Sequence, residues 1–328
     1  MVDWFSEFAE VVFQEFGPVV KKWITLNEPR ETAVSGYGGG WAAPGVEGLG
    51  TTTYVAAHNQ ILAHAAACRL YREKFQASQG GECGITLNMN WAEPKDPTSS
   101  VDRAAAERGS DFMIGWFAQP IFGDGAYPAS MRQKVDEKSL LQGFNQSRLP
   151  HFTDEESALV LGSADFLGLN IYTAYLMYEK DQGISEVSYL LDSDTAAEYP
   201  DSWVPSASDW LKVAPFGIRR CLQWVSAKYG REVPLYITEN GYSDYLGNLD
   251  DLGRIYYLKH YLNQVLKAIL EDGIDIRGYF AWSLLDNMEW AAGYTIKFGL
   301  NSVNFTDPDR KRWLNEDYGL DWRRNQKA

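Results

Sequence analysis

Cysteine is scarce in this sequence of 328 residues: its three occurrences are Cys68, Cys83 and Cys221. An odd count without metal-site spacing implies neither a disulfide framework nor a zinc site, so we predict three free, buried thiols. Positive charge is also in deficit, since 30 Lys and Arg against 44 Asp and Glu give a formal net charge of -14. This balance excludes a nucleic-acid partner, which requires a basic patch.

Long apolar runs are missing as well. No stretch approaches the roughly 20 residues that span a bilayer, and residues 1–4 lack the basic and apolar regions of a signal peptide. The triplets Asn145-Gln146-Ser147 and Asn304-Phe305-Thr306 are compatible with glycosylation of a secreted protein. A secreted location is therefore favoured over a cytoplasmic one.

Aromatic residues are abundant. They make up 14% of the chain, with 12 Trp and 19 Tyr, which is more than packing alone requires. Flat aromatic faces are common platforms for the apolar faces of sugars, although packing accounts for most such residues. The glycine-rich run at residues 36–40 neither follows a strand nor opens a helix, so it does not indicate a nucleotide site.

The hydrophobic pattern alternates between helical and strand periods. Helices are predicted over residues 2–16, 51–75, 102–117, 154–161, 215–229 and 250–271, and strands over 23–26, 84–88, 166–170, 235–238 and 278–282. Such alternation predicts an α/β fold with a parallel sheet, either open and doubly wound or part of an eight-stranded barrel. The polar stretch 179–208 is predicted to be a long surface insertion.

Two of the predicted strands run into a glutamate. Residues 23–26 lead to Asn27-Glu28-Pro29, and residues 235–238 lead to Glu239-Asn240-Gly241. Catalytic residues of barrel enzymes lie at the carboxyl ends of strands, and acetal hydrolysis needs two carboxyl groups on either side of one bond. A single glutamate at such a position is usually a surface or capping residue, but a pair indicates a glycosidase.

These motifs, Thr25–Pro29 and Ile237–Gly241, resemble the two signature motifs of family 1 glycoside hydrolases. The resemblance continues in family order through Gly115–Ile121, Arg148–Pro150, Phe166–Thr173 and Trp282–Trp290, and it fades after Arg312. The sequence is thus similar to β-glucosidases of animal or arthropod type. The resemblance implies a (β/α)8 TIM barrel in a single domain, residues 1–328.

The resemblance also implies a mechanism, which is retaining hydrolysis of terminal β-O-glucosides by double displacement. Glu28 would be the acid/base and Glu239 the nucleophile, with neither a cofactor nor a metal. The expected partner is a small β-glucoside or oligosaccharide. Further implied substrate-binding residues are Asn27, Asn170, Tyr172, Trp282, Glu289 and Trp290. Without the motif context, Asn170 and Tyr172 could equally be satisfied polar groups of the core.

The sequence departs from the family pattern at both ends. Only one helix precedes the Glu28 strand, where the family has three further strands, so we expect an incomplete barrel holding about strands 4 to 8, truncated at the N-terminus. The absent strands carry the family's sugar-binding Gln, a His-Trp segment and an Arg near the nucleophile. The tail after residue 312 is atypical because it lacks an amphipathic pattern. On this basis the chain is expected to be an inactive fragment.

Two other functions stay open. One is a non-catalytic carbohydrate-binding or receptor-binding member of the same fold, although such members usually lack one glutamate and this chain has both. The other is glycosyl transfer through the same covalent intermediate, with a sugar rather than water as the acceptor.

Overall fold

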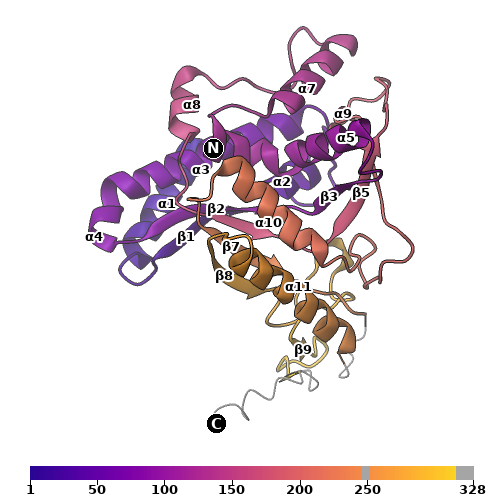
Figure 1. Cartoon of the computed structure of the whole chain (residues 1–328). Coiled ribbons are helices and arrows are strands. Elements are labelled where there is room, and N and C mark those ends of the chain that lie inside the picture. The colour runs from indigo at the N-terminus through magenta and orange to yellow at the C-terminus, as the bar shows by residue number, and fades with distance from the viewer. Residues whose placement is uncertain (246–250, 315–328) are drawn as a thin grey trace.

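The structure is a computed structural model that describes residues 1–245 and 251–314, and Figure 1 shows its arrangement. The helices are α1 (Val2–Phe16), α2 (Pro29–Glu31), α3 (Thr52–Tyr71), α4 (Ala77–Gln79), α5 (Ser100–Ser110), α6 (Trp116–Ala118), α7 (Ala129–Leu141), α8 (Asp154–Val160), α9 (Tyr189–Asp192), α10 (Phe216–Tyr229) and α11 (Leu252–Leu270). The strands are β1 (Lys22–Asn27), β2 (Glu82–Asn88), β3 (Trp91–Pro94), β4 (Leu167–Asn170), β5 (Ala174–Glu179), β6 (Thr195–Glu198), β7 (Leu235–Asn240), β8 (Ile276–Ala281), β9 (Asn301–Val303) and β10 (Arg312–Leu314).

The central sheet has five strands in the order β1-β2-β4-β7-β8. Every neighbouring pair is parallel, and helices connect successive strands. These are the five strands predicted from the sequence, and their order follows the chain, as in a (β/α)8 barrel. The fold prediction is therefore confirmed as part of such a barrel.

The middle of the sheet is buried on both faces. All four residues of β4 are buried, as are Ile85 and Leu87 of β2 and Ile237 of β7. Helices supply the outer layer of the core, for example through Ile61 of α3. Continuous apolar strands of this kind are typical of parallel sheets covered on each side.

The two outer strands are much more exposed. Within the described residues, β1 pairs with β2 alone and β8 with β7 alone in this sheet. Ile24 on β1 is 45% exposed and Phe280 on β8 is 59% exposed. A groove of about 760 Å³ lies beside β1 and includes Leu26, Phe5 and Ala63. Unpaired edges with apolar side chains are the expected liability of an incomplete barrel.

The stretch 179–208 is only partly the surface insertion that its polar composition predicted: residues 183–187 are exposed, but residues 192–195 are buried. It contains α9 and β6, and β6 pairs with β5 in a second sheet of order β3-β5-β6. Asp192 is buried because it accepts two hydrogen bonds of 2.8 Å from the Arg148 guanidinium and one from Tyr54. Paired partners distant in sequence allow a polar segment to be buried, and composition does not reveal them.

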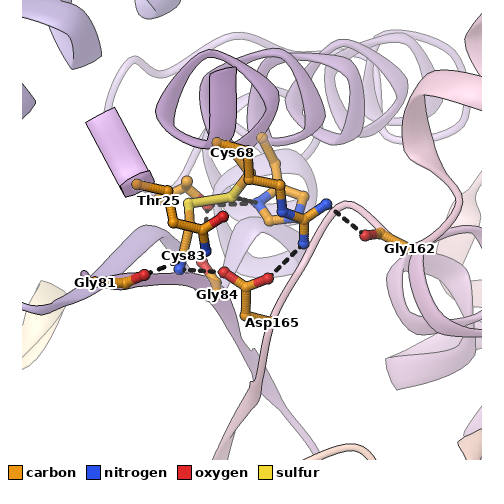
Figure 2. The surroundings of a disulfide bond; sticks show 10 residues. Thr25, Cys68, Gly81, Cys83, Gly84, Gly162 and Asp165 are labelled. Atoms are coloured by element: carbon orange, nitrogen blue, oxygen red, sulfur yellow. Dashed lines mark hydrogen bonds and ion pairs between the residues drawn. A yellow bond between two sulfur atoms is a disulfide. The ribbon is translucent and has the colours of Figure 1, made fainter. Parts of the chain in front are cut away.

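The prediction of three free thiols was wrong for two of them. Cys68 of α3 and Cys83 of β2 form a disulfide with a Cα–Cα distance of 5.6 Å, and only Cys221 is free and buried among the described residues. Figure 2 shows the bond between helix and strand, beside Asp165. The Asp165 carboxylate accepts from the Cys83 N–H at 2.8 Å and from Arg72 at 2.6 Å. Helix α3 packs against the sheet and so brings the sulfur of Cys68 to that of Cys83. An odd number of cysteines still allows two of them to form a disulfide.

Helix α7 and strands β3, β5 and β6 were not predicted. The helix predicted to start at Asp250 is α11, which begins at Leu252, and Asp250 itself lies outside the described residues. Of the atypical tail, residues 315–328 also lie outside them.

Candidate active site

The sequence-predicted residues lie at the carboxyl ends of the parallel strands. Asn27 ends β1, Asn170 ends β4, and Glu239 lies at the penultimate position of β7. Glu28 follows β1 with a left-handed backbone (φ 48°) and precedes α2. Non-glycine residues adopt this conformation rarely and often at functional sites. Glu28 thus stands where β1 turns into α2.

Asn170 of β4 contacts both Asn27 and Glu28 at the end of β1. The Asn170 Nδ2 donates to Glu28 Oε1 at 2.7 Å and to Asn27 Oδ1 at 3.1 Å. Because β2 separates β1 from β4, these residues would stand roughly 10 Å apart in a flat sheet. The side chains of Asn27, Glu28 and Asn170 therefore reach across the end of β2 to meet one another.

Glu239 is held by a buried tyrosine. The Tyr172 hydroxyl donates to Glu239 Oε2 at 2.6 Å. The Tyr172 carbonyl oxygen in turn accepts from the hydroxyls of Tyr257 and Tyr261 on α11, at 2.6 and 2.9 Å. The phenol is therefore anchored through its own backbone, and its proton is directed at one carboxylate oxygen.

The two glutamates differ in their electrostatic surroundings. Burial, followed by the charge of Glu239, raises the pKa of Glu28 to about 8, and the hydrogen bond from Asn170 opposes this. Burial also raises the pKa of Glu239 above its usual range, but side-chain hydrogen bonds from Tyr172, Asn27 and Asn170 lower it. Glycoside hydrolysis needs one carboxylate that is stabilised as an anion and one carboxyl group that retains its proton near neutral pH. The donors around Glu239 fit the first requirement, and the raised pKa of Glu28 fits the second.

The end of β8 brings three further predicted residues to this side of the sheet. The Trp282 N–H donates to the Asn240 carbonyl oxygen at 3.0 Å, which ties the residue after β8 to β7. Burial raises the pKa of Glu289, a hydrogen bond from Trp282 lowers it, and the charge of Glu239 raises it further. Glu289 and Trp282 are therefore joined near Glu239, whereas Trp290 is 58% exposed.

Two residues at the site were not predicted from the sequence. The Thr238 hydroxyl donates to Asn170 Oδ1 at 2.7 Å, so it fixes which way the Asn170 amide points. The ring of Trp210 lies 5.5 Å from that of Tyr172 and is 43% exposed. Thr238 could have been found from its place next to Glu239, but Trp210 is distant in sequence from every strand end.

In the part of the chain that the structure describes, no group of three or more His, Cys, Asp or Glu side chains is arranged to hold a metal ion. No helix in that part is both long enough and apolar enough to cross a membrane.

Comparison with known proteins gives a consistent result. The model of the family described as glycosyl hydrolase family 1 matches residues 1–318. Human lactase/phlorizin hydrolase is 46% identical over 314 residues, which is 95% of this chain and 16% of that protein. Beta-glucosidase 6 of Oryza sativa subsp. japonica is 42% identical over 94% of this chain. The chain spans 61% of the length of that rice protein.

Solved structures agree in fold. A rice β-glucosidase in a covalent complex with glucose superposes with a TM-score of 0.90 at 41% identity, over 98% of this chain and 69% of that one. An aphid myrosinase superposes with a TM-score of 0.91 at 40% identity, over 97% of this chain and 68% of its own.

Proposed function

Because this chain belongs to glycosyl hydrolase family 1, we propose that Glu28 and Glu239 are the acid/base and nucleophile of a retaining β-glycosidase that acts on terminal β-O-glucosides. The observation that carries the proposal is the contrast between the two carboxyl groups. The pKa of Glu28 is raised to about 8, while Glu239 accepts a hydrogen bond from Tyr172 at 2.6 Å.

The first half of the reaction uses both groups at once. The Glu239 carboxylate bonds to the anomeric carbon while the bond to the leaving oxygen breaks, and that oxygen takes the proton of Glu28. Glycosylation removes the charge of Glu239, which is one cause of the raised pKa of Glu28. Glu28 then becomes more acidic and stays ionised. Its carboxylate takes a proton from the water that attacks the anomeric carbon, while the bond between that carbon and Glu239 breaks and frees the Glu239 carboxylate.

The remaining site residues are proposed to bind the sugar. Asn27 would contact the 2-hydroxyl, Trp282 would stack on the ring, and Glu289 with Trp290 would bind the outer hydroxyls. A carboxylate at Glu289 would repel a 6-phosphate, so unphosphorylated glucosides are favoured over phosphorylated ones. Protonation by Glu28 is needed most by poor leaving groups, which favours O-glycosides over S-glycosides.

We further propose that turnover at the rate of a complete relative requires additional strands beside β1 and β8. Both strands have an unpaired side within the described residues, and Phe280 is 59% exposed. A measured rate for the 328-residue chain comparable to that of a complete family member would contradict this proposal.

The test combines turnover with covalent trapping. Hydrolysis of a chromogenic β-glucoside should be lost in Glu239→Gln. Azide should restore turnover to Glu28→Ala, because this anion attacks the anomeric carbon of the intermediate in place of water and needs no base to deprotonate it. A β-glucosyl reagent that stalls at the intermediate should add one sugar mass to the wild-type chain and none to Glu239→Gln. The exposed Glu137 supplies a matched control, Glu137→Gln, which should behave as wild type. Wild-type rates or labelling in Glu239→Gln would refute the assignment.

The same assays separate the alternatives. A non-catalytic carbohydrate-binding or receptor-binding protein would bind glucosides without covalent labelling. A glycosyl transfer enzyme would be labelled but would release its sugar to an added acceptor faster than to water.

A secreted location stays a proposal, and the Cys68–Cys83 disulfide supports it, since such bonds persist in oxidising compartments. Peptide mapping of protein purified from its source without reductant should recover Cys68 and Cys83 joined. Recovery of both as free thiols would contradict it.

A further inference from the structure

A second network of hydrogen-bonded polar side chains lies directly beside Glu28. Glu31 ends α2, and its N–H donates to the Glu28 carbonyl oxygen at 2.9 Å, so a single turn joins the two residues. Asn88, at the end of β2, donates from Nδ2 to Glu31 Oε1 at 2.9 Å. Asn88 is aligned with Asn170, the residue that donates to Glu28. Glu31 and Glu28 therefore each contact an asparagine at the carboxyl end of a neighbouring strand, β2 for Glu31 and β4 for Glu28.

Arg30 fixes this carboxylate from the other side. Its guanidinium forms an ion pair with Glu31 Oε1, and its Nε donates to the Tyr189 hydroxyl at 3.0 Å. The Tyr189 hydroxyl donates to the carbonyl oxygen of Phe112 at 2.6 Å. The Glu31 side chain is only 25% exposed. The position of the Glu31 carboxylate is thus fixed by neighbours that do not belong to the proposed catalytic pair.

We propose that Glu31 is a positioning residue for the acid/base: the like charge of its carboxylate, held by Asn88 and Arg30, keeps Glu28 protonated until a substrate binds. This inference rests on the proposed function. Two like charges within one turn, partly shielded from water, oppose ionisation of the more buried one. The charge of Arg30 acts in the opposite direction, and pairing with Glu31 masks it.

The charged groups around Glu28 come from two elements. Among the described residues, the charges of Glu239 on β7 and of Glu31 raise the pKa of Glu28, and that of Arg30 lowers it. Tyr172 is also close enough to interact with Glu28 electrostatically, because the charge of Glu28 contributes to the raised pKa of the Tyr172 phenol. Removal of the Glu31 charge leaves the opposing charge of Arg30 uncompensated, so the pKa of Glu28 should fall by the contribution of Glu31.

The test is a direct titration of Glu28 by NMR in protein labelled with ¹³C at glutamate carboxyls, with Glu28→Gln used for assignment. Glu31→Gln keeps an oxygen for Asn88 and Arg30 but loses the charge, so the pKa of Glu28 should fall by about one pH unit. Arg30→Met should raise it, and the double variant should lie between the two. Glu73→Gln, which removes an exposed partner of Arg69, should leave it unchanged.

The outcomes separate the two proposals. An ordinary pKa for Glu28 in the wild type would undermine the proposed function itself. A raised pKa that Glu31→Gln leaves in place, with the fold intact by circular dichroism, would overturn the role of Glu31 alone. Opposite shifts in the two single variants would support it, because a merely structural role for the pair predicts the same direction for both. Where the chain turns over, the alkaline limb of its pH profile should move with the titrated value.

Discussion

The raised pKa of Glu28 should lower the free energy of unfolding at high pH. The variant Glu28→Gln tests this prediction without requiring that the chain be active. The folded protein holds the Glu28 proton up to about pH 8, whereas the ordinary carboxyl value is 4.5. Between these values the folded state binds more protons than the unfolded state. The contribution of Glu28 is therefore most favourable below about pH 4.5, and stability is lost as the pH rises through this window.

The size of this loss of stability follows from the difference between the ordinary and the raised pKa of Glu28. A carboxyl group shifted from 4.5 to about 8 destabilises the folded state above both values by about 5 kcal/mol at most. Glu28 keeps some solvent contact and is coupled to Glu239, so we expect roughly 1–3 kcal/mol. Glutamine is isosteric and can still accept the hydrogen bond from Asn170, but it cannot ionise. Glu28→Gln should thus be more stable than the wild type at pH 8.5 and nearly equal to it at pH 4.5.

The measurement is the free energy of unfolding in urea across this pH range, with Glu137→Gln as the exposed control. The difference between Glu28→Gln and wild type should grow steadily with pH, while the control difference stays flat. A stability difference for Glu28→Gln that does not change between pH 4.5 and 8.5 would refute the reasoning, because it would mean that Glu28 ionises as an ordinary carboxyl.

Three further predictions concern a hydrogen bond to Glu239, a buried ion pair and the disulfide. Tyr172→Phe removes a hydrogen bond that lowers the pKa of Glu239, so labelling by a β-glucosyl epoxide should require a higher pH; an unchanged labelling profile would exclude that role. Asp192→Asn leaves the buried Arg148 guanidinium without its charge partner and should cost about 3–5 kcal/mol in urea unfolding. A loss below 1 kcal/mol would show that the pair contributes little. Cys83→Ser opens a loop of 15 residues and should cost about 3 kcal/mol, and reductant should destabilise the wild type but not this variant. Equal sensitivity of both proteins to reductant would contradict the disulfide.

Much of the fold could be predicted from local patterns. The five strands of the parallel sheet are short apolar runs bounded by helical periods, and burial in the middle of the sheet imposes such runs directly on β2, β4 and β7. The small sheet of β3, β5 and β6 was not predicted because its strands contain polar residues, for example Glu93 of β3 and Thr195 of β6, and their backbones are satisfied by pairing between distant segments.

The candidate site divides in the same way. Local sequence patterns were enough to place two glutamates at the carboxyl ends of predicted strands, because position along a strand is a local property. How the two glutamates differ depends on tertiary contacts: Asn170 of β4 donates to Glu28, α11 anchors Tyr172 against Glu239, and α2 places Glu31 beside Glu28. Proton affinity depends on burial and on charges brought close from distant segments, so identical glutamates acquire different chemistry only when the chain has folded.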